Sequence, residues 1–336
     1  MKYLRPIAMT DAARPRAGLT LAGGWCWFDR VEVLERGAAG RVVPVGDLPA
    51  AALHRLTAPR PAFAGLGMDR PRIMGILNVT PDSFSDGGQF LAPDAALEQA
   101  RLMAEAAEII DIGGESTRPG AVEVSVADEV ARTAPVIAAL RSGGMEAVIS
   151  IDTRKAAVAE AALLAGADVV NDVSALGFDA ALGPLVARTG APVVLMHAQG
   201  APATMQDNPQ YCDVLLDVYD ALETKLRAAV ALGIARSRIA VDPGIGFGKT
   251  AEHNLALIRG LSLFHGLGCP IVLGASRKRF VGTYGQAADP AARMPGSVAV
   301  ALAGVAQGVQ MVRVHDVAET RQALRLWLAV NGGEHE

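Results

Sequence analysis

Polar residues follow a series of short apolar runs in this chain, and their types suit two different chemistries. One group contains amides and carboxylates, which can pair with the adjacent N–H donors and ring-nitrogen acceptors of a flat heterocycle. The other group contains cations and hydrogen-bond donors, which suit a phosphate or carboxylate. Together they predict a site for a planar, donor-rich ring that carries an anion. The first group is Asn78, Asp152, Asn171 and Asp242, and the second is Arg118, Lys278, Arg313 and His315.

Eight apolar runs rich in Ile and Val must position these residues. Most of them lack polar alternation, as expected of strands that are buried on both faces. Ala/Leu/Glu-rich segments with helical spacing lie between them, for example Pro93–Ala107 and Lys155–Ala165. Eight strand–helix units over roughly 260 residues predict the α/β class and a (β/α)8 TIM barrel, with a doubly wound open sheet as the main alternative. The runs are Ile73–Leu77, Ile109–Ile112, Val148–Ile151, Val169–Val170, Val193–Met196, Ile239–Val241, Ile271–Leu273 and Met311–Val314.

A barrel of this kind gathers the carboxyl ends of its strands on one rim, where its active site lies. A single polar residue after a strand is usually a helix cap or a turn residue, which is one interpretation of Asp172 and Ser174. Eight polar strand ends on one rim instead indicate a site. Two Gly/Pro/Ser-rich loops, Thr80–Gly88 and Glu115–Gly120, are expected on this rim, either closing over a substrate or as inert surface loops.

Composition excludes several classes of function. The formal net charge of -4 and the aromatic content of 4% give no basis for a nucleic-acid or membrane surface. The three cysteines are widely spaced, which indicates buried thiols and a reducing compartment rather than a disulfide framework. No apolar run approaches the ~18 residues of a spanning helix, and the first 25 residues lack the apolar stretch of a signal peptide. A cytoplasmic protein is the expectation.

The chain divides into two regions according to whether apolar runs and helical segments alternate regularly. Residues 1–66 are irregular and form an N-terminal extension of unknown role, with a strand-like stretch from Trp25 to Leu34. The segment Ala58–Gly67 contains Pro and Gly and is interpreted as a linker. Residues 67–333 form the predicted barrel domain.

The segment Gly244–Thr250 superficially matches a phosphate-binding P-loop. That pattern requires a glycine five positions before the glycine of Gly-Lys-Thr, and this position is Pro243. Nucleotide hydrolysis is therefore not predicted, and a Gly-rich turn after the sixth strand is the simpler interpretation.

Long motifs in the barrel region resemble those of one enzyme family. Met74–Gly88 and Asp111–Gly120 are similar to the first and second signatures of the dihydropteroate synthases, a pterin-binding TIM-barrel family. Shorter motifs follow in family order, and the similarity runs from about residue 71 to 330. They are Ser150-Ile-Asp-Thr153, Asn171-Asp-Val173, Leu195-Met-His197, Val241–Lys249, Ser276-Arg-Lys278 and Arg313-Val-His-Asp316.

The resemblance implies an activity and a set of residue roles. The activity is condensation of 6-hydroxymethyl-7,8-dihydropterin diphosphate with 4-aminobenzoate, giving 7,8-dihydropteroate and pyrophosphate in folate biosynthesis. The implied catalytic residues are Asp152, Lys278, Arg313 and His315. The pterin would contact Asp152, Asn171, Met196, Asp242, Phe247 and Lys278. The diphosphate would contact Asn78, Thr117, Arg118, Arg313 and His315, and Asn78 would also reach a Mg2+ cofactor. The 4-aminobenzoate pocket would contain Phe84, Ser276 and Lys278.

The resemblance also implies a homodimer, a sulfonamide target and small-molecule substrates, without nucleic acid or membrane partners. Two alternatives stay open at this point. A pterin-binding methyltransferase of the same superfamily would share the carboxylates and Asn after strands three, four and six. It would not need the Thr-Pro-Asp-Ser-Phe loop or the anion-binding set. A non-catalytic paralogue would retain the barrel without turnover.

Overall fold

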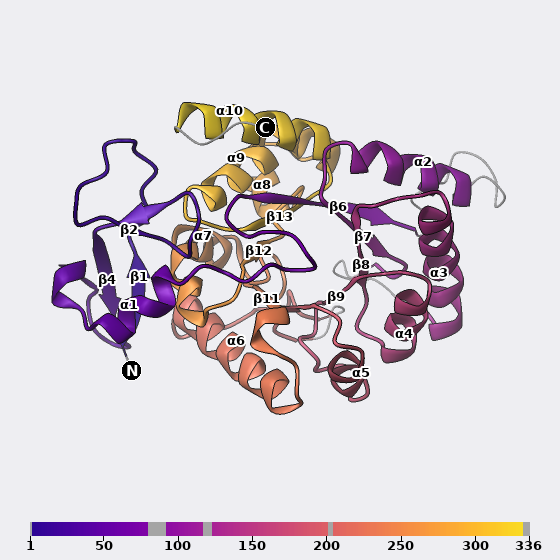
Figure 1. Ribbon diagram of the computed structural model, residues 1–336, viewed down its shortest axis with the longest axis horizontal. Helices are drawn as coiled ribbons and strands as arrows, with labels where there is room; N and C mark the ends of the chain where they lie inside the picture. Colours follow the sequence, from indigo (N-terminus) through magenta and orange to yellow (C-terminus); the bar gives the residue numbers. More distant parts are fainter. Residues whose placement is uncertain (1, 80–91, 117–122, 201–203, 332–336) are drawn as a thin grey trace.

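The computed structural model describes residues 2–79, 92–116, 123–200 and 204–331. Eight parallel strands form one sheet in the order β11-β10-β9-β8-β7-β6-β13-β12, and a parallel bridge between Val241 and Ile271 joins its two edges into a barrel. The predicted TIM barrel is confirmed (Figure 1). Its strands are β6 (Arg72–Asn78), β7 (Ile109–Gly113), β8 (Val148–Asp152), β9 (Val169–Asp172), β10 (Val193–Met196), β11 (Ile239–Asp242), β12 (Val272–Leu273) and β13 (Met311–Val314).

Helices follow the strands and surround the barrel (Figure 1). Side chains that accept hydrogen bonds from first-turn N–H groups begin three of them: Ser125, Asp213 and Thr250. The two example helices predicted from sequence are confirmed with shifted ends. The helices are α2 (Ala92–Ala104), α3 (Val126–Ser142), α4 (Ala156–Leu164), α5 (Leu182–Thr189), α6 (Val214–Ala231), α7 (Ala251–Arg259), α8 (Arg279–Tyr284), α9 (Met294–Val305) and α10 (Val317–Val330), with short 3-10 turns η3 (Arg236–Arg238), η4 (Leu261–Leu267) and η5 (Pro290–Arg293).

Side chains alternate between the two faces of each barrel strand, because successive residues of a strand point in opposite directions. The outward positions, such as Ile110, Ile112 and Val170, are buried in the main core with the helices. At the base of the barrel, each of the eight strands contributes one residue to a separate apolar cluster. These residues are Met74, Ile109, Val148, Val169, Val194, Ala240, Val272 and Met311.

The N-terminal extension forms a small unit of its own at one side of the barrel (Figure 1). Its antiparallel sheet has the order β1-β4-β5, and β2 pairs with β3. A separate apolar cluster that includes Phe28, Val31 and Leu56 lies inside it. The strand-like stretch expected from Trp25 to Leu34 is present as two strands, β3 and β4, interrupted at Asp29. The elements are β1 (Tyr3–Pro6), β2 (Leu19–Thr20), β3 (Trp27–Phe28), β4 (Arg30–Leu34), β5 (Arg41–Pro44), η1 (Val45–Asp47) and α1 (Ala50–Thr57).

The segment interpreted as a linker also has a packing role. Phe63 is 1% exposed and joins the apolar cluster at the barrel base, as does Met68, which directly follows the segment and is 2% exposed. Arg60, in the same segment, donates to the backbone oxygen of His265 at 2.8 Å. The division at residues 66 and 67 stays a prediction, but this segment closes the base of the barrel rather than merely spanning two regions.

Two other expectations are tested by the described residues. All three cysteines are free, so no disulfide links them, but the expectation of buried thiols is wrong for Cys212, which is exposed. None of the helices in the described ranges is both long and apolar enough to cross a membrane.

Candidate active site

Side chains alternate between the two faces of each barrel strand, and the polar residues share the inward face with the apolar residues of the base. Positions two or four residues beyond a base residue lie on the same inward face of the strand. Asp111 is two residues beyond Ile109, and Asp152 is four beyond Val148. The same spacing applies to the inward residues at the carboxyl ends of five other strands. These residues are Asn78, Asn171, Met196, Asp242 and Arg313.

One guanidinium group links two carboxylates at the centre of this rim. Arg313 donates from Nε to Oδ2 of Asp111 at 2.6 Å and from Nη2 to Oδ2 of Asp152 at 2.7 Å. Asn171 donates to the same Asp111 oxygen at 3.0 Å. One polar cluster therefore joins side chains from β7, β8, β9 and β13. Within it, Arg313 lies beside Asp152 and Asn171, two of the residues predicted to bind the heterocycle.

Two buried carboxylate oxygens in this cluster have no hydrogen-bond partner among the described residues. Oδ1 of Asp111 and Oδ1 of Asp152 make no hydrogen bond to any described residue. An unpartnered buried acceptor costs about 1–3 kcal/mol, so such atoms are rare unless a ligand supplies the missing donor. Both oxygens are therefore suited to accept N–H groups from a bound ring.

Burial controls the ionisation of these groups. It raises the pKa of Asp152 well above its usual range; Arg313 opposes this shift, and the neighbouring Asp111 adds to it. The pKa of Asp242 is also raised by burial, with Lys278 and the backbone N–H of Gly244 acting against the shift. Burial alone would lower the pKa of Arg313, but Asp111 and Asp152 reverse this effect and raise it, so the guanidinium stays charged.

Asn78 lies beside the carboxylate cluster at the end of β6. A Cβ atom at Gly113, on the neighbouring strand, would lie 3.8 Å from Oδ1 of Asn78 and 3.5 Å from the Cβ of Asp152. The absence of a side chain at Gly113 therefore leaves open the space between these two residues.

A second part of the rim contains a lysine next to an aromatic ring. Nζ of Lys278 donates to the backbone oxygen of Ile245 and lies 4.4 Å from the ring centroid of Phe247. Burial lowers the pKa of Lys278 to about 8, while Asp242 acts in the opposite direction. Met196, at the end of β10, is 5% exposed and faces the turn that carries Phe247. Lysine, ring and carboxylate thus lie together at one side of the rim.

The last two strands join their polar ends through Ser276. Its hydroxyl oxygen accepts from the backbone N–H of His315 at 3.2 Å and lies 3.0 Å from Nδ1 of that residue. Arg277, between Ser276 and Lys278, has a left-handed φ of 56° and forms an ion pair with Asp316. The Ser276–Lys278 turn and the Arg313–Asp316 segment are therefore held together as one unit.

The turn after β11 and the residue Asp172 both have the conformations that the sequence predicted. The segment Gly244–Thr250 is a turn after β11, with left-handed φ values at Gly244, Gly246 and Gly248, as expected. Asp172 accepts from the backbone N–H groups of Ser174 and Leu176, which confirms its interpretation as a turn residue.

The described start of the second loop has a structural partner. Glu115 forms ion pairs with Lys155 at 2.7 Å and Arg154 at 3.0 Å, so its carboxylate is engaged within the protein. Phe84, Thr117 and Arg118, and the loop Thr80–Gly88, lie outside the described residues.

Two polar residues of the site were not among the predicted site residues. Asp111 precedes the end of its strand by two positions, so a search of strand ends passes over it; its even spacing from Ile109 would have found it. Lys249 is 3% exposed beneath the turn after β11, and its sequence context offers no signal of burial.

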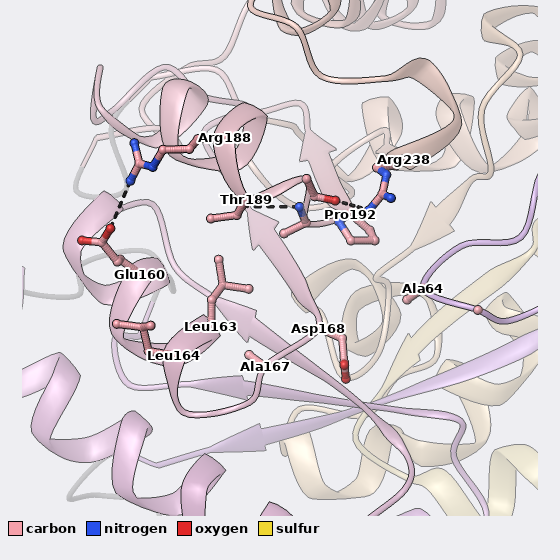
Figure 2. A pocket seen from close by; sticks show the side chains of 13 residues that line it. Ala64, Glu160, Leu163, Leu164, Ala167, Asp168, Arg188, Thr189, Pro192 and Arg238 are labelled. Carbon is pink, nitrogen blue, oxygen red and sulfur yellow. Dashed lines mark hydrogen bonds and ion pairs between the residues drawn. The ribbon is translucent and has the colours of Figure 1, made fainter.

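The groove shown in Figure 2 lies at the other end of the barrel. It has a volume of about 710 Å3 and contacts segments that precede β9, β10 and β11, together with Ala64 of the extension. The chemistry of TIM barrels lies at the carboxyl ends of the strands, and this groove is at their amino ends. Its ion pair between Arg188 and Glu160, at 3.1 Å, is a surface contact. We assign the active site to the rim.

Known proteins are similar to this chain in sequence. Residues 74–315 match the family described as pterin binding enzyme. A dihydropteroate synthase from Neisseria meningitidis serogroup C is 47% identical over 269 residues, covering 79% of this chain and 94% of the relative. The corresponding protein of Escherichia coli K12 is 44% identical over 262 residues, covering 78% of this chain and 92% of the relative.

Solved structures are similar to this chain in both fold and sequence. Dihydropteroate synthase from Xanthomonas albilineans with 4-aminobenzoic acid has a TM-score of 0.77 at 44% identity, covering 82% of this chain and 99% of that one. The Yersinia pestis synthase in a sulfonamide drug complex has a TM-score of 0.75 at 45% identity, with coverages of 80% and 97%. The chain therefore belongs to the pterin binding enzymes, as a member of the dihydropteroate synthase family.

Proposed function

We propose that the rim cluster is the site where this synthase condenses 6-hydroxymethyl-7,8-dihydropterin diphosphate with 4-aminobenzoate. The observation that carries the proposal is the pair of unpartnered oxygens on Asp111 and Asp152 beside Arg313. The pterin ring presents adjacent N–H donors, which match such acceptors. The same rim also holds Asn171, Asp242 and Lys278. Apolar surfaces on which a flat ring can pack are provided by Met196 and Phe247.

The diphosphate is placed at the side of Arg313, His315 and Asn78. Within the described residues Nε and Nη2 of Arg313 bond to carboxylates and Nη1 makes no such bond, so it is suited to a phosphate oxygen. Thr117 and Arg118 belong to this subsite by resemblance. The 4-aminobenzoate is placed near Ser276 and Lys278, with Phe84 included by resemblance.

The proposed reaction breaks the bond between the pterin methylene carbon and the bridging oxygen, and the electron pair leaves with pyrophosphate. Arg313 and His315 stabilise the charge that grows on the leaving oxygen, because preorganised donors act most strongly in a buried site. The field of Asp152 stabilises positive charge on the pterin. The aryl amine then bonds to the methylene carbon and loses one proton to solvent.

The residues present also fit a Mg2+ cofactor. Mg2+ prefers oxygen ligands and is usually held by one or two protein groups together with substrate phosphates and water. Oδ1 of Asn78 faces the open space beside Gly113, so Asn78 is placed to hold the ion. Bound Mg2+ would neutralise charge on the diphosphate.

The direct test is to incubate the protein with the pterin diphosphate, 4-aminobenzoate and Mg2+ and to measure dihydropteroate and pyrophosphate. We expect both products in equal amounts, and a large loss of both in an Asp111→Asn variant. Turnover of the wild-type protein without a change in the variant would place the site elsewhere.

Further properties are proposed on the basis of the relatives. The sulfonamide complex of the Yersinia pestis relative supports a sulfonamide site in this chain, and competition of sulfonamides with 4-aminobenzoate would test it. A homodimer through helices on one side of the barrel stays a prediction from the family resemblance, and a cytoplasmic location stays a prediction from the sequence. Light scattering of the purified protein would test the dimer.

A further inference from the structure

Lys249 is buried beneath the active site, and no step of the proposed reaction uses it. Its ammonium group lies within 3.4 Å of four acceptors, and none of these four is a carboxylate. The backbone oxygens of Gly244 and Phe247 lie at 2.8 and 3.0 Å. The backbone oxygen of His197 lies at 3.4 Å, and Nδ1 of the His197 ring lies at 2.9 Å.

This group joins two backbone segments that approach each other closely. A Cβ atom at Gly244 would lie 1.8 Å from the backbone oxygen of His197, and one at Gly248 would lie 2.4 Å from that of Gln199. The turn after β11 therefore packs directly against the chain leaving β10. Three carbonyl oxygens of this contact point toward one place, where they repel each other and need a shared donor.

The charged form of Lys249 is disfavoured by its surroundings, but the side chain keeps N–H donors in either protonation state. Burial lowers the pKa of Lys249 to about 7, with a further decrease from Lys278 and an opposing effect from Asp242. Burial and Lys249 lower the pKa of His197 to about 3, so that ring is neutral and its Nδ1 accepts from the lysine.

The turn held in this way carries the contacts of the pterin pocket. The backbone N–H of Gly244 donates to Oδ1 of Asp242 at 2.7 Å. The backbone oxygen of Ile245 accepts from Lys278, and the ring of Phe247 lies below the same ammonium group. A shift of the turn would therefore move Asp242, Phe247 and Lys278 together. The diphosphate side, at Asn78, Arg313 and His315, belongs to other strands.

We propose that Lys249 is a positioning residue for the pterin half of the site: its ammonium group holds the turn after β11 against the end of β10. This inference rests on the proposed function only in taking the ring to lie beside Asp242 and Lys278. Lys249 contacts no substrate, and it acts through the turn.

The experiment measures binding of two separate ligands to Lys249→Met, which keeps the unbranched stem of the side chain, one heavy atom shorter, without its donors. The probes are 6-hydroxymethyl-7,8-dihydropterin and inorganic pyrophosphate with Mg2+, each followed by calorimetry. We expect the Kd of the pterin to rise about tenfold or more, because charge-assisted hydrogen bonds are lost. The Kd of pyrophosphate should change less than about twofold.

Two further variants make the result specific. Lys225→Met removes an exposed lysine from α6 and should leave both Kd values unchanged. Lys249→Gln keeps amide donors and should raise the pterin Kd by an intermediate factor of about three. It also preserves the test if the methionine variant does not fold.

Two outcomes would overturn the proposal. One is wild-type pterin affinity in a folded Lys249→Met or Lys249→Gln variant, and the other is an equal loss of pterin and pyrophosphate binding, as expected of general damage. Turnover by the wild-type protein is measured first. If the wild type makes no product, the proposed function fails; if it does and the variant binds normally, only the positioning role fails.

Discussion

The two ends of the barrel use the same inward-facing positions for opposite purposes. At the base, one apolar residue from each strand packs with Phe63 and Met68 into a closed cluster. At the rim, the inward positions two or four residues further along hold Asp111, Asp152 and Arg313. Burial of apolar groups stabilises the base, whereas burial of charge is costly unless it is fully paired. Residues that stabilise the fold and residues that form the site therefore lie in successive layers along the same face of each strand.

The largest expected effect comes from breaking the rim with Arg313→Ala. This change leaves two buried carboxylates without their cation, and the diphosphate loses a donor. We expect kcat/KM to fall by at least about a thousandfold, because removal of one partner from a buried ionic group is strongly unfavourable. Steady-state kinetics measure the fall. Arg321→Ala, which breaks an ion pair with Glu108 near the base, is the control and should retain activity. Similar losses in the two variants would refute the assigned roles of the two ends.

Breaking the base with Phe63→Ala should give the converse result. Truncation of a fully buried Phe costs about 3–5 kcal/mol of unfolding free energy. The rim lies on the far side of the barrel, so kcat/KM at a temperature where the variant is folded should change less than about twofold. Urea denaturation and kinetics on the same sample measure both quantities. Leu164→Ala, at a side chain 84% exposed, is the matched control for stability. Loss of rate without loss of stability would show that this residue affects the site directly.

The dependence of kcat/KM on pH is a smaller expected effect that separates the ionisable rim from the apolar base. Folding raises the pKa of Asp152 and lowers that of Lys278 to about 8. We expect kcat/KM to decrease on the acid side as Asp152 gains a proton and above pH of about 8 as Lys278 loses one, by about tenfold per pH unit on each limb. Lys278→Met should remove the decrease centred near pH 8 and keep both the acid limb and the contribution of Lys249, whose pKa is about 7. An unchanged alkaline limb in this variant would assign it to another group.

The pKa shifts of Asp152 and Lys278 also determine how the free energy of unfolding changes with pH. Because the folded pKa of Asp152 is raised, its stabilising contribution is present at low pH and is lost as the pH rises through that pKa. Because the folded pKa of Lys278 is lowered, its contribution is present above its unfolded pKa and is lost as the pH falls through about 8. The ionised forms of Asp152 and Lys278 therefore oppose folding near neutral pH, while the apolar base contributes no such dependence. Urea midpoints of wild type and Lys278→Met across this range measure the difference.

The sequence by itself determined the barrel and most of its rim. Eight runs of Ile and Val bury both faces of a strand, so their spacing with helical segments predicted the topology, and all eight strands were confirmed. Polar residues at the ends of those runs predicted Asn78, Asp152, Asn171, Asp242 and Arg313 as neighbours in space. These inferences depend on local periodicity and on the rule that parallel strands align their carboxyl ends, which need no knowledge of distant contacts.

Only the tertiary structure decided which groups meet. The sharing of Arg313 by Asp111 and Asp152, the cage of Lys249 and the insertion of Phe63 into the barrel base join residues far apart in the chain. A segment with Pro and Gly has the composition of a linker whether or not one of its side chains is buried. Burial and pairing depend on the closure of the barrel, because each contact requires strands from different parts of the sequence to be in place at once.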